Sequence, residues 1–126
     1  MLLCLGFQWR TAVEQQVQRA ADGGVRSIVI RPAVVYGNGG GILKRMVDDA
    51  QRLGGAYCIG EGGNRWPFVH IDDLADLYRR AIESAAAGSL FYAVSGDSIQ
   101  LRLLAEKVSH AAGTKGRVIS MTLEAP

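Results

Sequence analysis

The chain has 126 residues, a hydrophobic fraction of 48%, a charged fraction of 21% and a formal net charge of +2. This length suits one domain with one core, and the composition is that of an ordinary globular protein. The small net charge argues against the strongly basic surface of proteins that bind nucleic acids or anionic membranes. We therefore predict a single domain over residues 1–126, with no nucleic-acid or membrane partner.

The cysteines and the start of the chain indicate the compartment. Cys4 and Cys58 are too few for a disulfide framework or a four-ligand zinc site, so we interpret them as reduced thiols and predict no metal site. The apolar residues 1–7 are too short for a signal peptide and have no basic residue before them. No apolar stretch reaches the length of a membrane span. The sequence therefore predicts a cytoplasmic protein.

The first predicted element is a helix that begins at Thr11. The segment Thr11-Ala12-Val13-Glu14 has the spacing of a capping box, in which Glu14 would bond back to the cap. Apolar residues then recur on one helical face, and Gly23-Gly24 ends the helix.

The segment from Ser27 to Tyr36 organises the rest of the chain. Residues 27–30 are apolar or β-prone and do not alternate, which is typical of a parallel strand covered on both faces. We expect an inner strand with a neighbour on each side, whose regular pairing is ended by Arg31-Pro32. Ligands bind beyond the carboxyl ends of such strands, so the expected crevice lies at residues 31–41.

Further elements follow from apolar spacing and from glycines. A helix is predicted over residues 42–53 and is ended by Gly54-Gly55. The remaining expected segments are a strand over 56–59, a polar loop over 60–64, an extended stretch over 67–70, an amphipathic helix over 71–85, a strand over 90–94, a helix over 101–111 and a strand over 117–121.

Local signals refine two of these helices. Asp76 and Arg80 have the spacing of a surface ion pair on the helix over 71–85. Ser98 is the predicted cap of the helix over 101–111, and Gly113 is its predicted end. The alternation of helices and strands predicts an α/β fold.

The two glycine runs are not dinucleotide fingerprints. Ile42 and Arg65 stand where the third glycine of G-x-G-x-x-G belongs, and no P-loop lysine follows either run. We interpret both as loops, although the backbone amides of residues 37–41 can still line a site.

Three side chains near these loops are candidates for binding or chemistry. His70 precedes two aspartates, which suggests a metal or acid–base pair, but a histidine hydrogen-bonded within a strand-to-helix turn is the favoured interpretation. Trp66 is suited either to stacking on a ligand or to burial. Tyr36 offers a phenol at the carboxyl end of the central segment. The residues alone supply no complete catalytic set.

Two motifs together resemble a known family. Arg31-Pro32-Ala33-Val34-Val35-Tyr36-Gly37, followed by Val69-His70-Ile71-Asp72-Asp73-Leu74-Ala75, resembles the extended short-chain dehydrogenase/reductases, the NAD-dependent epimerase/dehydratase family. Residues 64–70 are similar to an atypical branch labelled nucleoside-diphosphate-sugar epimerase or NAD(P)-binding oxidoreductase. The resemblance covers Trp9 to Glu124. It implies a partial Rossmann-like fold, doubly wound with a mainly parallel sheet, that lacks the N-terminal dinucleotide-binding half.

The resemblance also implies roles for particular positions. NAD or NADP is the implied cofactor, and a nucleotide-sugar-like molecule is the implied ligand. The cofactor-binding positions would be Pro32, Ala33 and Tyr36. The substrate-side positions would be Gly39, Asn64, Arg65, Trp66 and His70. Many relatives carry an arginine for the nucleotide phosphates where this chain has Trp66.

The departures from the family decide between the functional interpretations. The Gly-rich turn is absent, and the family's Tyr-x-x-x-Lys pair would fall on Gly6 and Arg10, so no catalytic residue is assigned. The chain then resembles a fragment of a nucleotide-sugar epimerase/dehydratase that is not catalytically competent by itself.

Two other interpretations stay open. One is a non-catalytic small-molecule-binding or assembly module, a homo-oligomer whose residues 1–8 are a non-native segment or an added strand that covers bared edges. The other is a distinct enzyme that uses Tyr36, His70 and Arg65.

Overall fold

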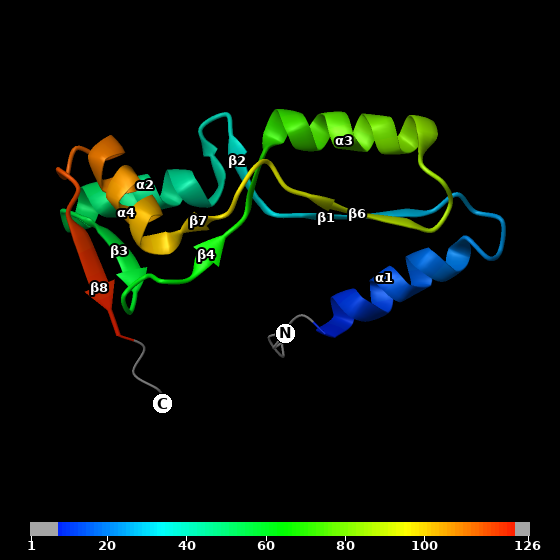
Figure 1. The fold of residues 1–126 in the computed structure, drawn as a ribbon, viewed down its shortest axis with the longest axis horizontal. Helices are drawn as coiled ribbons and strands as arrows, with labels where there is room; N and C mark the ends of the chain where they lie inside the picture. The colour runs from blue at the N-terminus through cyan, green and yellow to red at the C-terminus, as the bar shows by residue number, and fades with distance from the viewer. Residues whose placement is uncertain (1–7, 123–126) are drawn as a thin grey trace. The chain divides into compact units, whose positions relative to one another are not determined.

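The computed structural model describes residues 8–122 and has a mixed α/β architecture (Figure 1). Its contacts divide the chain into two compact units, of which unit 1 holds residues 1–32 and 75–93 and unit 2 holds residues 33–74 and 94–126. The elements in chain order are α1 (Gln8–Ala20), β1 (Ile28–Pro32), β2 (Val34–Gly37), α2 (Gly41–Leu53), β3 (Ala56–Ile59), β4 (Arg65–Trp66), β5 (Phe68–His70), α3 (Ile71–Ser84), β6 (Ser89–Ala93), β7 (Ile99–Gln100), α4 (Leu101–Ala111) and β8 (Val118–Met121).

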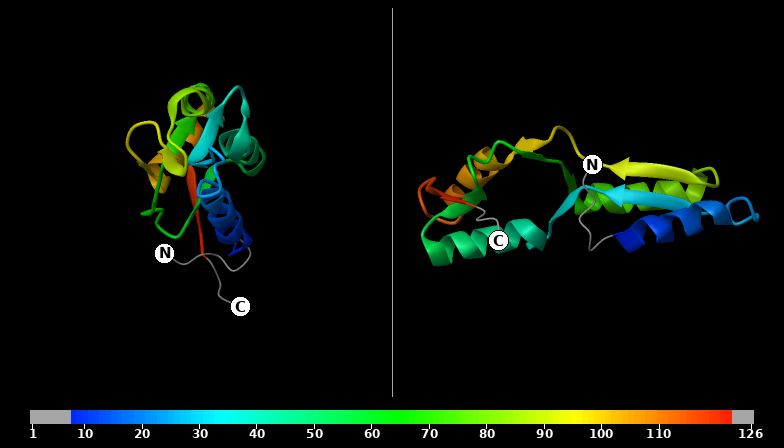
Figure 2. Two further views of the ribbon diagram at one scale, coloured as in Figure 1. Left: turned by 90° about the vertical axis from the view of Figure 1, so that its right-hand side faces the viewer. Right: turned by 90° about the horizontal axis from the view of Figure 1, so that it is seen from below.

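Unit 1 is built on the parallel pair β1 and β6. Ile28 pairs with Ser89 at one end of the register, and Pro32 pairs with Ala93 at the other. The helices α1 and α3 flank this pair on opposite faces (Figures 1 and 2). Val29 is the buried residue of β1, whereas α1 has no buried residue. The parallel direction predicted for the first strand is confirmed.

The predicted capping box of the first helix is wrong. The helix begins at Gln8, so Thr11 lies inside it. Glu14 binds Arg31 instead: the Arg31 Nε donates to both carboxylate oxygens at 3.0 and 3.1 Å, and Nη2 lies 2.5 Å from Oε2. A two-pronged, charge-assisted contact with a distant strand therefore replaces the local bond to a helix end.

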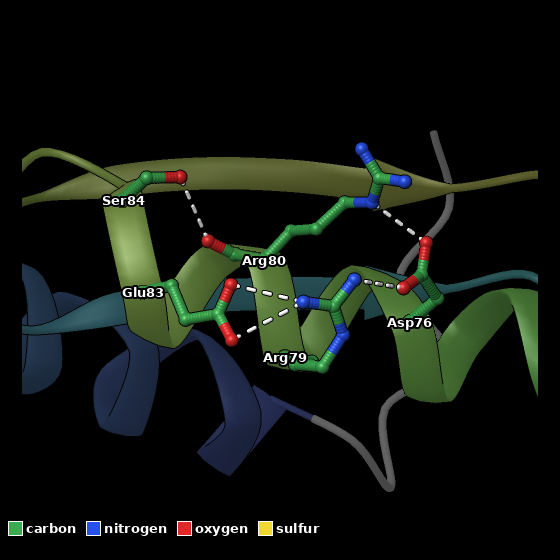
Figure 3. Close-up of polar contacts among 5 residues, drawn as sticks. All are labelled: Asp76, Arg79, Arg80, Glu83 and Ser84. Carbon is green, nitrogen blue, oxygen red and sulfur yellow. Dashed lines mark hydrogen bonds and ion pairs between the residues drawn. The ribbon is translucent and has the colours of Figure 1, made fainter.

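Arginine side chains also form hydrogen bonds with the helix α3, both at its C-terminal end and on its exposed face. Arg26 donates to the carbonyls of Ala81, Ile82 and Ala85 at the C-terminal end of α3, where the Ala81 carbonyl also accepts from the Ala85 N–H at 3.0 Å. On the exposed face, Asp76 accepts from Arg79 and from Arg80, each at 2.7 Å (Figure 3). The Asp76–Arg80 ion pair predicted from spacing is confirmed.

The neighbours of Asp76 complete a surface network. Arg79 also donates to Glu83, and the Ser84 hydroxyl donates to the Arg80 carbonyl (Figure 3). The hydrogen bonds from Arg79 and Arg80 lower the pKa of Asp76 below its ordinary value. Asp76 lies one helical turn before Arg80 and Ser84 lies one turn after it, so the network spans both turns.

Unit 2 contains three short strand pairs and two helices around one apolar cluster. β2 pairs parallel with β5, β3 pairs parallel with β8, and β4 pairs antiparallel with β7. The helices α2 and α4 contact each other, and both contact β3. The buried cluster consists of Met46, Ala50, Ala56, Cys58, Phe68, Leu101, Leu104, Ala105 and Val108.

The glycines predicted to end the helices α2 and α4 are confirmed, but the predicted cap at the start of α4 is wrong. Gly54 ends α2 with a left-handed φ of 77°, and its N–H bonds the Ala50 carbonyl. Ser98 is not the cap of α4, because Gln100 precedes that helix and Ser98 accepts a hydrogen bond from Arg65 instead. Gly113 follows the C-cap Ala112 with a φ of 80°.

The expected turn after Pro32 contains an additional strand. The chain resumes pairing at Val34, whose N–H bonds the Pro67 carbonyl at 3.1 Å, because a proline removes only one donor and the valines that follow favour extended backbone. The expectation of neighbours on both sides was wrong for the described residues 8–122, where β1 pairs with β6 alone and β2 with β5 alone.

Some predictions fall on residues 1–7, which lie outside the described part of the chain. These are the added strand, the Cys4 thiol and the placement of Gly6. Within residues 8–122 no helix is long and apolar enough to cross a membrane.

Candidate functional site

The glycine-rich run forms a tight turn between β2 and α2. Asn38 and Gly39 both have a positive φ, 53° and 67°, as in the type I′ turns of β-hairpins. Gly37 pairs with Gly40 and Tyr36 pairs with Gly41 in antiparallel bridges. The backbone groups of this turn therefore bond across it.

Tyr36 and His70 lie side by side at the ends of the paired strands β2 and β5. They are partners in the register, and their ring centroids are 5.1 Å apart with the planes at 85°. Gly37 makes this approach possible. A Cβ there would lie 2.9 Å from His70 Nε2, and the φ of 124° is one that other residues rarely adopt.

His70 is fixed by hydrogen bonds at the start of α3. Its Nδ1 accepts from the Asp72 N–H at 3.1 Å, so the neutral ring carries its proton on Nε2. Its own N–H donates to the Ser95 hydroxyl at 3.4 Å, and that hydroxyl donates to Asp73 at 2.7 Å. The interpretation of His70 as a hydrogen-bonded residue of a strand-to-helix turn is confirmed.

A shallow hollow opens beside Tyr36. It has a volume of about 270 Å³ and is lined by Tyr36, Gly37, Gly39, Gly40, Leu43, Lys44 and Val47. Lys44 is the cation of this hollow, but its Nζ bonds both carboxylate oxygens of Asp48 at 2.5 and 2.6 Å. The predicted residues Tyr36 and Gly39 thus share one concave surface.

A second hollow lies on another face of α2, and we call it the α2–β3 pocket. Its volume is about 160 Å³, and it is lined by Ile42, Arg45, Met46, Asp49, Tyr57, Cys58, Ile59, Trp66 and Leu101. The helix residues 42, 45, 46 and 49 follow the i, i+3, i+4, i+7 spacing of one helical face. Trp66 is the predicted site residue in this pocket.

The loop residues next to Trp66 have structural partners. The Arg65 Nε donates to the Ser98 hydroxyl at 2.9 Å, and its Nη2 donates to the Ser98 carbonyl. The Asn64 carbonyl accepts from the Leu101 N–H at 2.8 Å. These contacts fasten β4 to β7 and to the start of α4, and they direct the Arg65 guanidinium to Ser98.

Two of the predicted cofactor residues, Pro32 and Ala33, are consecutive in the chain, the first in unit 1 and the second in unit 2. Pro32 is the last residue of β1 and is exposed, and Ala33 is the half-buried link to β2. Their cofactor role stays a prediction.

The chain matches a known family over residues 9–93, which is the NAD dependent epimerase/dehydratase family. The chain belongs to this family. Its kinship was predicted from the two motifs around Tyr36 and His70, and the parallel pairing of β2 with β5 accounts for why these motifs occur together.

Individual relatives show how much of the family is present. The chain is 32% identical to human epimerase family protein SDR39U1 over 71% of its own length and 30% of the relative, and 26% identical to the 2-alkyl-3-oxoalkanoate reductase of Stenotrophomonas maltophilia over 82% and 33%. The dTDP-glucose 4,6-dehydratase DesIV of Streptomyces venezuelae, solved with NAD, shares the fold with a TM-score of 0.74 and 18% identity over 86% and 35%. The chain therefore spans about a third of the relatives that it matches.

The NAD(P) that this family implies is not matched by a G-x-G-x-x-G fingerprint within residues 8–122. The glycine run closest to such a fingerprint bonds across its own turn. This run is therefore a closed turn between β2 and α2.

Sequence reasoning missed the other lining residues of the α2–β3 pocket. Arg45, Asp49 and Tyr57 are far from Trp66 in the chain and match no motif. Ile42 and Ile59 mark this pocket because the structure leaves them 38% and 49% exposed, and exposure is not visible in the sequence. Among the described residues, no group of three or more His, Cys, Asp or Glu side chains is placed to hold a metal.

Proposed function

We propose that this chain is the substrate-side part of an NAD(P)-dependent oxidoreductase of the epimerase/dehydratase family. By itself it would bind a small molecule without catalysing cofactor-dependent turnover. The observation that carries the proposal is the placement of both hollows of unit 2 around α2, with Tyr36 and Gly39 at one and Trp66 at the other.

Two features support a binding role without turnover. Arg65, which a distinct enzyme would use beside Tyr36 and His70, bonds Ser98 instead. The Nδ1 atom of His70 accepts the Asp72 N–H at the start of α3. The neutral ring therefore has no free acceptor nitrogen with which to act as a general base. A nucleotide sugar is the ligand class that the dehydratase relative suggests, and an oxoalkanoate is the class that the reductase relative suggests.

Cofactor titration tests the first part of this proposal. We expect isothermal titration of the 126-residue chain with NAD and with NADP to show no saturable binding below millimolar concentration. Tight binding of either cofactor would overturn the proposal, because the chain would then hold the cofactor without a G-x-G-x-x-G fingerprint.

A second candidate function is assembly into a homo-oligomer. Unit 1 exposes Trp9, Ile82 and Tyr92 at 60%, 62% and 68%, and β1 has one paired neighbour within residues 8–122. Exposed apolar side chains and an open strand edge favour pairing with another chain. We expect light scattering to show a dimer or larger species at micromolar concentration, and a stable monomer would count against this function.

The cytoplasm is the proposed location. Cys58 is a free, buried thiol, which suits a reducing compartment.

A further inference from the structure

The α2–β3 pocket has an apolar interior that reaches the surface. Its apolar lining residues are Ile42, Met46, Cys58, Ile59, Trp66 and Leu101. Ile42 and Ile59 are 38% and 49% exposed, although both line the pocket. A ligand that covers them removes apolar surface from water, which is the main favourable term in binding an apolar group.

The volume of the pocket limits the group that enters. It is about 160 Å³, close to a dry protein cavity of about 150 Å³ that holds one benzene molecule. One six-membered ring or a short alkyl chain therefore fits. A nucleotide base is less suitable, because each of its donors and acceptors that is left without a polar partner weakens binding.

The charged side chains at the pocket favour a ligand with a single negative charge. Arg45 and Asp49 lie on the lining face of α2, and Asp49 bonds Arg52 at 2.9 Å. Arg45 has no hydrogen-bond or ion-pair partner within residues 8–122. One available guanidinium beside a carboxylate suits a monoanion, whereas a dianionic phosphate would also face the negative charge of Asp49.

We propose that the α2–β3 pocket binds a small apolar carboxylate, with its ring or alkyl chain against Trp66 and its carboxylate on Arg45. This inference rests on the proposed substrate-binding function and names the ligand class of that site. A phosphate-binding arginine at position 66 would favour a nucleotide. The tryptophan at this position in the present chain favours an apolar group instead.

Ligand titration on the full chain tests the inference. The Trp9→Phe variant leaves Trp66 as the single tryptophan, so its fluorescence reports on the pocket. The probes are phenylacetate, its neutral analogue phenylacetamide, and uridine monophosphate. We expect saturable quenching by phenylacetate, about tenfold tighter than by phenylacetamide and tighter than by the nucleotide, since a charged hydrogen bond is worth at least this factor.

Two matched variants separate Arg45 from general electrostatics. Arg45→Gln should weaken phenylacetate binding about tenfold and leave phenylacetamide binding unchanged. Lys107→Gln removes the same charge from an exposed position of α4 that lines neither hollow, and should change neither affinity.

Each other outcome overturns the inference. These outcomes are equal binding of the acid and the amide, equal losses in the two variants, tighter binding of the nucleotide, and no saturable binding by the folded chain. Preference for the nucleotide would leave the substrate-binding function intact. Tight NAD(P) binding would overturn the proposed function without altering the comparison between the acid and the amide.

Discussion

The two units are stabilised by different kinds of contact. Unit 2 has a contiguous buried cluster in which α2 and α4 contact β3. Unit 1 buries Val29, Ala81 and Ala93, and its α1 has no buried residue. Arginine side chains instead join its elements, since Arg31 links β1 to α1 and Arg26 bonds the end of α3. Apolar burial thus dominates one unit, and exposed polar contacts dominate the other.

The largest expected effect compares apolar residues of the two units. Leu104 is 7% exposed in the core cluster, so Leu104→Ala should lower the free energy of unfolding by about 2–5 kcal/mol through lost burial and a cavity. Ile82 is 62% exposed in the single chain, so Ile82→Ala should change the free energy of unfolding of the monomer by less than about 0.5 kcal/mol. Urea unfolding measures both. Equal losses would show that unit 1 buries Ile82 in solution, as the oligomer proposal requires.

A backbone substitution should have a smaller effect that is confined to unit 2. Gly37→Ala forces an unfavourable φ and places a methyl group against the His70 ring, which should cost about 1–3 kcal/mol. Gly40→Ala is the control, because Gly40 has a φ of −123° and open space at its Cβ. Urea unfolding gives the cost, and the chemical shifts of His70 report the displaced ring. An unchanged ring in the Gly37 variant would contradict the proposed close approach.

The sequence predicts contacts between residues that are close together in the chain, and it does not predict contacts between distant ones. The helix before Gly54 and the Asp76–Arg80 pair depend on spacing within a few residues, so local patterns predicted them. The Thr11 capping box failed because Glu14 bonds Arg31, a partner seventeen residues away that no local pattern reveals.

The candidate site divides in the same way. Tyr36 and His70 belong to motifs that the sequence shows directly. The α2–β3 pocket instead combines Arg45, Tyr57 and Trp66 from separate elements, and only tertiary packing brings them around one cavity. Local periodicity identifies the faces of a helix but not the residues that another element places opposite them.

The smallest expected effect is an acid-induced loosening of unit 1. Hydrogen bonds from Arg31 lower the pKa of Glu14 below its ordinary value of 4.5. Folding therefore favours the ionised carboxylate, and its contribution is complete above pH 4.5 and is lost as the pH falls through the lowered pKa. Both side chains are accessible to solvent, so the effect should be modest and weaker at high salt.

Tryptophan fluorescence can separate the two units in this acid range. In a Trp66→Phe background, Trp9 of α1 should report a change as the pH falls below 4.5, and Arg31→Gln should remove most of that pH dependence. In a Trp9→Phe background, Trp66 should change less over the same range, because apolar burial around it does not titrate. Parallel changes at the two tryptophans would instead mean that the units unfold together, and the contrast between them would then concern local contacts rather than separate stabilities.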